Sequence, residues 1–360
     1  MDASNQAMPL WAWATPVGAG AVLAAAVLMA ASTPLMVIAG LAVIGGVFSA
    51  VHHAEVVAHR VGEPYGTLVL ALAVTVIEVA LIVSVMIAGG PDKAGLARDT
   101  VFAAVMIICN GLVGLCLLSG GVRHFEQGFQ LQGALAALAV LAALTTLSLV
   151  LPNFATTLPG PVLSNAQLAF AGVASLVLYV SFVFVQTVRH RDYFLPENAD
   201  LEDHAAPPSR QIAIVSLGLL VLSLVGVVGL AKVLTPTIEA GVAFVGAPKA
   251  VVGIAIAALV LLPEGLSALR AARSNRLQTS MNLALGSALA SIGLTIPAVA
   301  AVSLLLDQPL LLGLGGKETV LLGLTLLLCV ITLGTGRTTV LQGIVHLVVF
   351  SAFLFFAFVP

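Results

Sequence analysis

Two glutamates stand in the middle of long apolar runs of this 360-residue sequence. Glu78 is the only ionisable residue in ALAVTVIEVALIVSV, and Glu264 directly follows Pro263 in ALVLLPEGLSALRAAR. In a helix that begins at Gly66, a rise of about 1.5 Å per residue puts Glu78 about 18 Å along the axis, near the centre of a hydrocarbon core about 30 Å thick. A carboxylate at that depth costs at least about 2.5 kcal/mol, and such residues usually mark ion or proton pathways. The alternative is an acid that only joins two packed helices.

The groups around these glutamates are suited to binding a cation. Pro263 has no N–H, so inside a helix it frees the backbone carbonyl of Leu259 near Glu264. Carboxylate and carbonyl oxygens are hard ligands that suit Ca²⁺, or Na⁺ where fewer charges are present. Desolvation favours the neutral acid and a nearby cation favours the carboxylate, so protons and cations compete for the same oxygens. An empty site with two charges would be costly in the membrane, which would make exchange obligatory. The alternative for Pro263 is a packing kink.

Four hydroxyl or amide side chains lie where they could support such a site. Thr75 precedes Glu78 by three residues and therefore shares its helix face, and Asn110 lies in the apolar run MIICNGLVG. Ser287 and Ser291 lie in LGSALASIG. We expect these side chains to bind the ion or to orient its ligands, although small and hydroxyl residues also serve ordinary helix packing in membranes.

A second group of ionisable residues lies in the second apolar run. His52, Glu55 and His59 have i, i+3, i+7 spacing, which places them on one helix face and suggests a proton relay or gate. Glu239 occupies the position equivalent to Glu55 in the internal repeat described below. The alternative is a polar rim at the membrane surface. His346, in the last apolar run, is interpreted as a packed or interfacial residue.

The composition identifies a membrane protein, because 60% of the residues are hydrophobic and 8% are charged, with a mean hydropathy of +1.14. The formal net charge of −2 and the lack of a Lys/Arg cluster exclude a nucleic-acid-binding protein. Three cysteines within apolar runs indicate neither a disulfide framework nor a zinc site. The N-terminus lacks a basic segment before its apolar run, which predicts a retained helix and not a cleaved signal peptide.

Apolar segments of about 20 residues predict eleven transmembrane helices and an all-α polytopic fold. Their approximate bounds are 10–31, 34–58, 66–88, 100–118, 131–151, 166–188, 212–233, 247–270, 280–306, 318–334 and 339–359. The residues after the seventh segment extend its helix or form a short separate one, and Pro236 favours a break.

The basic residues predict an orientation in the cytoplasmic (inner) membrane with the N-terminus in the cytoplasm and the C-terminus outside, in the periplasm. Nine basic residues then lie in cytoplasmic loops: Arg60, Arg123, Arg189, Arg191, Arg210, Arg270, Arg273, Arg276 and Arg337. Five lie outside: Lys93, Arg98, Lys232, Lys249 and Lys317.

The sequence also contains an internal repeat. AEVVAHRVGEP (54–64) aligns with IEAGVAFVGAP (238–248), and each is followed by an apolar segment with one buried acid. Five helices per half is an odd number, so the halves would have inverted topology, as in many secondary transporters. The predicted parts are an N-terminal helix (1–33), a first repeat (34–188), a cytoplasmic acidic linker (189–211) and a second repeat (212–360). The linker acids Glu197, Asp200, Glu202 and Asp203 would bind a regulatory cation or simply be solvated.

The motifs GEPYGTLVLALAVTVIEV (62–79) and GIAIAALVLLPEGLSAL…NLALGSALASIGLTIP (253–297) resemble the two repeats of the calcium/proton antiporters, within the cation/calcium exchanger superfamily. The bacterial ChaA-type branch is the most similar, and the resemblance runs from about Val51 to the C-terminus. It implies that Glu78 and Glu264 are the ion-binding acids and that Asn110 and Ser287 are polar positions of the following helices. Plant and fungal members have Gly-Asn before each acid, where this chain has Val74-Thr75 and Val260-Leu261.

These observations predict a secondary transporter that exchanges cytoplasmic cations for protons by alternating access. The cation is Ca²⁺, with Na⁺ and K⁺ also open, and strictly monovalent exchange is the alternative. No cofactor beyond the transported ions and no obligate protein partner is expected; the surroundings are membrane lipid. An intramembrane hydrolase is disfavoured, because no buried Ser/His or His/His/acid set has workable spacing. A cation channel would conduct without counter-transport.

Overall fold

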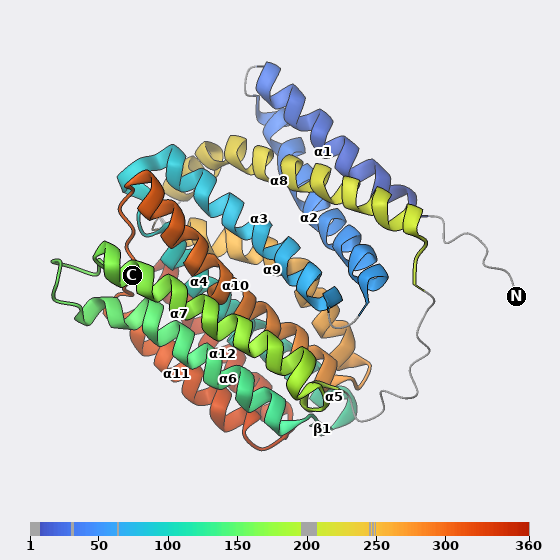
Figure 1. Ribbon diagram of the computed structural model, residues 1–360, viewed down its shortest axis with the longest axis vertical. Helices are drawn as coiled ribbons and strands as arrows, with labels where there is room; N and C mark the ends of the chain where they lie inside the picture. Colours follow the sequence, from blue (N-terminus) through green and yellow to red (C-terminus); the bar gives the residue numbers. More distant parts are fainter. Residues whose placement is uncertain are drawn as a thin grey trace, which may run out of the picture. The chain divides into compact units, whose positions relative to one another are not determined.

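The computed structural model describes residues 8–29, 32–62, 65–195, 207–244, 246, 248 and 250–359. Helices occupy the eleven predicted positions (Figure 1). The helices labelled α4 and α5 below are joined by the π-helical turn η2 and form a single span, Leu96–His124. In the described residues ten of the eleven are long and apolar enough to cross a membrane. In the remaining one, α3, the described apolar part runs from Ala71 to Ile87. The prediction of an all-α polytopic membrane protein is therefore confirmed.

The helix bounds follow the apolar runs closely. They are α1 (Leu10–Leu28), α2 (Thr33–Val61), α3 (Tyr65–Gly89), α4 (Leu96–Met106), α5 (Val113–His124), α6 (Leu131–Thr145), α7 (Asn165–Phe184), α8 (Arg210–Phe244), α9 (Ala250–Arg273), α10 (Leu277–Leu306), α11 (Gly316–Leu333) and α12 (Val340–Phe358). Short elements are the 3-10 turns η1 (Gly90–Lys93), η4 (Leu151–Phe154) and η6 (Arg191–Phe194), the π-helical turns η2 (Ile107–Leu112), η3 (Thr146–Val150) and η5 (Val185–Arg189), and the two-residue strands β1 (Gln127–Gly128) and β2 (Arg337–Thr338).

Two prolines expected to disturb helices leave them continuous. α8 runs through Pro236 over 35 residues, so the break suggested by the sequence does not occur and the following residues extend the helix. α9 likewise runs through Pro263. A proline removes one backbone hydrogen bond, and neighbouring groups in a membrane protein can compensate for the loss of that bond.

The chain divides into two compact units. Unit 1 contains residues 1–84 and 203–241, and unit 2 contains residues 85–202 and 242–360. Each unit therefore combines segments from both predicted repeats, whereas the predicted parts follow chain order. All four linker acids lie outside the described residues. Near its start, the linker forms the 3-10 turn η6.

Unit 1 is held together by small residues that let helices approach closely. α1 lies beside α2 (Figure 1). A Cβ added at Gly226 of α8 would lie 3.1 Å from the Cβ of Ala19, and one at Gly46 of α2 would lie 2.7 Å from Val227. A side chain at Gly46 would have to displace Val227, and one at Gly226 would press on Ala19. Both glycines therefore favour this close spacing, which is typical of membrane helices.

Unit 2 packs helices of one predicted repeat against helices of the other. α10 lies against α7 and α9, and α12 lies against α5 (Figure 1). The continuous segment α4–η2–α5 is the most deeply buried of the candidate spans in the described residues. α10 and this segment are the core helices of unit 2, and both contact α9.

Hydrogen bonds gather the loops of unit 2 at two separate ends. At one end, β1 pairs with β2, and Gln127 donates to the carbonyl of Ala272 at the turn between α9 and α10. At the other end, the N–H of Leu311 donates to Ala94, and that of Leu314 donates to Leu149. The first set contains the loops predicted to be cytoplasmic, and the second set contains those predicted to lie outside.

Candidate ion-binding site

Glu264 lies on α9 and contacts α10. The hydroxyl of Ser287 donates a hydrogen bond to Oε2 of Glu264, at 3.2 Å. The next residue, Gly265, packs near Leu112 of η2, because a Cβ at Gly265 would lie 3.6 Å from the Leu112 Cδ1. The carboxylate is half-buried and its neighbour Pro263 is buried. Unit 2 therefore provides a carboxylate with a hydroxyl donor between three apolar segments.

Glu78 lies on α3 and is 2% exposed, with buried Ile77, Leu81 and Ile82 on the same helix. Thr75, 4% exposed, donates its hydroxyl hydrogen to the carbonyl of Ala71 at 2.8 Å. Its oxygen lone pairs can still accept a hydrogen bond or bind a cation. Glu78 belongs to unit 1 and Glu264 to unit 2.

Asn110 is fully buried in η2, and its amide is bonded to helices other than α9. Nδ2 donates to the hydroxyl of Thr325 on α11 at 2.8 Å, and Oδ1 lies 3.1 Å from Nδ1 of His346 on α12. Nε2 of His346 lies 3.0 Å from the hydroxyl of Thr332. The sequence identified Asn110 but missed its bonds to Thr325 and His346, and the bond from His346 to Thr332. His346 is a packed residue, as one of the two interpretations held, but it packs through polar contacts.

The remaining predicted support residues lie on α9 and α10. Ser291 is buried one turn after Ser287, and Leu259 is half-buried one turn before Pro263. Within the described residues no group of three or more His, Cys, Asp or Glu side chains could hold a metal ion.

The predicted relay residues on α2 differ in their surroundings. Glu55 and His59 are exposed, and Glu239 on α8 is half-buried. The His52 ring is 4.9 Å from that of Trp11. The sequence did not indicate a role for the neighbouring His53, which is fully buried.

His53 bonds to a carbonyl that a proline has freed. Its Nε2 lies 2.8 Å from the carbonyl oxygen of Ala12 on α1. Pro16, four residues later, has no N–H with which to bond that carbonyl. The carbonyl only accepts, so Nε2 carries the hydrogen. The sequence could have indicated this contact, because a proline within a helix frees the carbonyl four residues earlier, as Pro263 does for Leu259.

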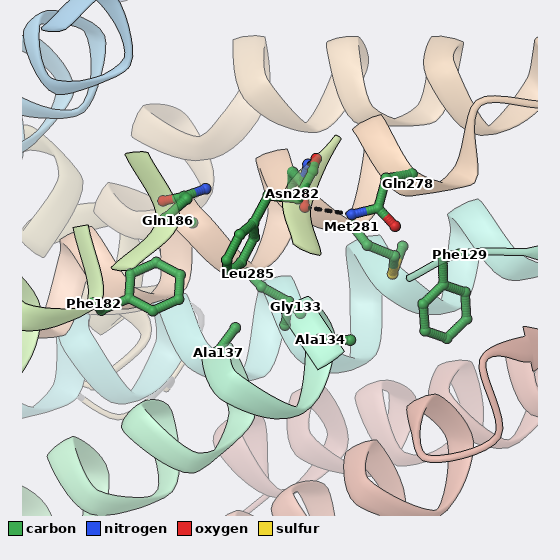
Figure 2. Close-up of a pocket in the computed structure, with 12 residues that line it drawn as sticks. Phe129, Gly133, Ala134, Ala137, Phe182, Gln186, Gln278, Met281, Asn282 and Leu285 are labelled. Atoms are coloured by element: carbon green, nitrogen blue, oxygen red, sulfur yellow. Dashed lines mark hydrogen bonds between the residues drawn. The ribbon is translucent and has the colours of Figure 1, made fainter. Parts of the chain in front are cut away.

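A small pocket in unit 2 lies where α6, α7 and α10 meet the start of the linker. Gln186, Gln278 and Asn282 line it together with apolar side chains (Figure 2). Gln278 donates to the Asn282 Oδ1 at 3.0 Å, and Asn282 donates to the carbonyl of Phe194 in η6 at 2.5 Å. The polar groups of this pocket thus hold η6 in place.

A family model described as sodium/calcium exchanger protein matches residues 31–188 and 215–359. The chain belongs to this family. Its predicted membership of the cation/calcium exchanger superfamily is therefore confirmed, and the match begins where the second helix is about to start. α1 lies outside the matched residues.

Relatives of this exchanger-family chain agree with the ChaA-type assignment. It is 38% identical over 316 residues to the sodium-potassium/proton antiporter ChaA of Escherichia coli (strain K12), covering 87% of this chain and 85% of ChaA. It is 52% identical over 361 residues to y4hA of Sinorhizobium fredii, a protein named for ionic transport. That alignment covers 98% of this chain and 97% of y4hA. The solved structure of native YfkE shares the fold, with a TM-score of 0.75 at 16% identity, covering 98% of this chain and all of that one.

Proposed function

We propose that the protein is a secondary active transporter in which Glu78 and Glu264 bind cytoplasmic cations and protons in alternation. The observation that carries the proposal is the placement of each acid within an apolar helix, Glu78 almost wholly buried and Glu264 with a hydroxyl donor. Structural roles seldom require an ionisable group in such surroundings, whereas transport does. Membership of an exchanger family fits transport better than catalysis.

The mechanism follows from the cost of uncompensated charge. Each carboxylate is neutral when protonated, and a bound cation offsets its charge when it is not. The form that carries neither proton nor cation is the costly one, so the protein changes access mainly in its loaded states. Proton entry from outside then drives cation export by alternating access between the two predicted inverted repeats.

The cation is proposed to be Ca²⁺, with Na⁺ and K⁺ as further substrates. Two carboxylates balance one divalent ion, and the family description names both sodium and calcium exchange. Strictly monovalent exchange is the second candidate, and the name of ChaA, sodium-potassium/proton antiporter, favours it. Thr75 also stands where plant and fungal relatives carry an asparagine, which removes an amide oxygen from the ligands of Ca²⁺.

We propose further that the N-terminus and the linker face the cytoplasm of a bacterial cell, across the inner membrane. This orientation is supported by the excess of arginine in the corresponding loops, which unit 2 gathers at one end. Cysteines placed one at a time at Arg191 and Lys317, in a variant lacking native cysteines, should react from opposite sides of the membrane. Labelling of Arg191→Cys from outside in intact cells would contradict this orientation.

The deciding experiment is transport in proteoliposomes with an imposed proton gradient. Uptake of ⁴⁵Ca²⁺, ²²Na⁺ and ⁸⁶Rb⁺, the last standing for K⁺, is followed for wild type, Glu78→Gln and Glu264→Gln. We expect both variants to lose exchange while they still insert and fold. The matched control is Glu126→Gln, since Glu126 is an exposed acid paired with Arg337. Full proton-coupled flux in Glu78→Gln or Glu264→Gln would refute the two-carboxylate mechanism. Wild-type uptake of ²²Na⁺ or ⁸⁶Rb⁺ without uptake of ⁴⁵Ca²⁺ would favour strictly monovalent exchange, the second candidate function.

A further inference from the structure

The hydrogen bonds around Asn110 have a fixed direction that begins at a backbone carbonyl. Thr325 Oγ1 lies 2.7 Å from the carbonyl oxygen of Leu321. A carbonyl only accepts, so Thr325 donates its hydrogen there, since two acceptors would repel at this distance. Its oxygen must then accept from Asn110 Nδ2, at 2.8 Å. The orientation of the Asn110 amide is thereby determined.

The same direction continues into the imidazole ring. The amide oxygen Oδ1 of Asn110 faces His346 Nδ1 at 3.1 Å, so Nδ1 carries the hydrogen. In the neutral ring Nε2 is then the acceptor, and Thr332 donates its hydroxyl hydrogen to it at 3.0 Å. Thr325 and Thr332 are seven residues apart on one face of α11. His346 and Asn110 therefore connect α11, α12 and η2.

Close helix approach makes this connection geometrically feasible. A Cβ added at Gly114 would lie 3.1 Å from the Cβ of His346, and one at Gly111 would lie 3.2 Å from the Phe350 ring. Asn110, Thr325 and His346 are all fully buried. Loss of one member would strand a buried polar atom, which costs more than the bond itself contributes.

We propose that His346 is a positioning residue for cation exchange, which holds Asn110 and with it the π-helical turn that packs beside Glu264. This inference rests on the proposed function of Glu264. The link to the glutamate is the packing of η2 against α9, where Leu112, two residues after Asn110, lies near Gly265. π-helical turns within α-helices are frequent at functional sites, because the extra residue redirects side chains. His346 holds this turn in place and does not itself bind the cation.

The test compares three substitutions of His346 in proteoliposomes. The side-chain amide of Asn reaches the place of Nδ1, and that of Gln reaches the place of Nε2. We expect His346→Asn to keep near-normal exchange, and His346→Leu and His346→Gln to raise the half-saturating ²²Na⁺ or ⁴⁵Ca²⁺ concentration about tenfold, with a smaller change in maximal rate. Equal kinetics for the Asn, Gln and Leu variants would overturn the proposal. If His346→Leu does not fold, the Asn and Gln variants still decide.

A spectroscopic measurement tests the hydrogen-bond chain without transport. ¹⁵N spectra of labelled histidine in the full-length protein should show an Nδ1–H tautomer that is absent from His346→Asn. The His346 ring also has a hydrogen bond with the backbone of Cys109, so Asn110→Leu should shift the Nδ1 signal of His346 without abolishing it. Thr332→Val should leave the half-saturating concentration within about twofold. His53 supplies an Nε2–H signal of its own, so the signals of His346 are assigned by their loss in His346→Asn. An Nε2–H tautomer assigned to His346 in this way would contradict the proposed direction.

The two proposals fail in different ways. A wild-type protein without proton-driven cation flux refutes the proposed function and, with it, this role of His346. Normal wild-type flux with normal half-saturation in both His346→Leu and His346→Gln refutes only the positioning role. A double variant Asn110→Leu/His346→Leu should behave like Asn110→Leu alone, and additive losses would show that His346 acts by another route.

Discussion

The hydroxyl of Ser287 on α10 donates to Oε2 of Glu264 on α9, at 3.2 Å. A donor of this kind stabilises the ionised carboxylate, and hydrogen bonds to charged groups contribute about 1.5–3 kcal/mol. We predict that Ser287→Ala favours the protonated form of Glu264 and so raises the half-saturating cation concentration about tenfold or more at fixed pH. Flux at a series of cation concentrations measures this.

Ser303→Ala is the matched control for that prediction. Ser303 lies on the same helix and donates to the carbonyl of Gln308, at the end of α10. Its loss should lower stability slightly and leave the cation dependence unchanged. An unchanged half-saturating concentration in Ser287→Ala would remove Ser287 from the site.

The contact between α5 and α12 predicts a strong effect at one glycine. A Cβ at Gly343 would lie 2.5 Å from the backbone N of Leu118 and 2.9 Å from the carbonyl oxygen of Gly114. Backbone atoms cannot move away without separating the helices, and overpacking of this kind costs about 1–3 kcal/mol. Gly343→Ala should therefore lower the thermal unfolding temperature in detergent.

Gly323→Ala provides the comparison, because nothing lies within 4 Å of a Cβ at that position on α11. Alanine is the better helix former, so this change should be neutral or stabilise by up to about 1 kcal/mol. Equal unfolding temperatures for the two variants would mean that α5 and α12 are not packed as described.

Pro16 and His53 should be energetically coupled. His53→Leu removes the Nε2 donor from the Ala12 carbonyl and leaves only the longer bond from Ser49, at 3.4 Å. We expect a loss of about 1–3 kcal/mol, measured by thermal unfolding. In a Pro16→Ala background the helix supplies its own N–H, so the same substitution should cost less. Equal costs in the two backgrounds would show that the freed carbonyl is not the reason for the contact.

The sequence predicted the helices well because each must be apolar for its full length. Pro236 was the exception, since its pattern suggests a break where the helix continues. The sequence also indicated Ser287 beside Glu264, which the structure joins. It did not predict the bonds from Asn110 to Thr325 and His346, since they join residues 215 and 236 positions apart. Such pairs depend on helix packing, which apolar periodicity leaves open.

The start of the linker should be held by Asn282, in the pocket of Figure 2. Its amide donates to the carbonyl of Phe194, whose ring packs edge-on against Phe182 with centroids 5.7 Å apart. Asn282→Leu should release η6, so trypsin should cleave after Arg191 several-fold faster, measured by mass spectrometry of the fragments. Gln186→Leu changes another amide of the same pocket and should leave the cleavage rate as it is. The same rate in Asn282→Leu and wild type would show that the bond from Asn282 does not hold the segment.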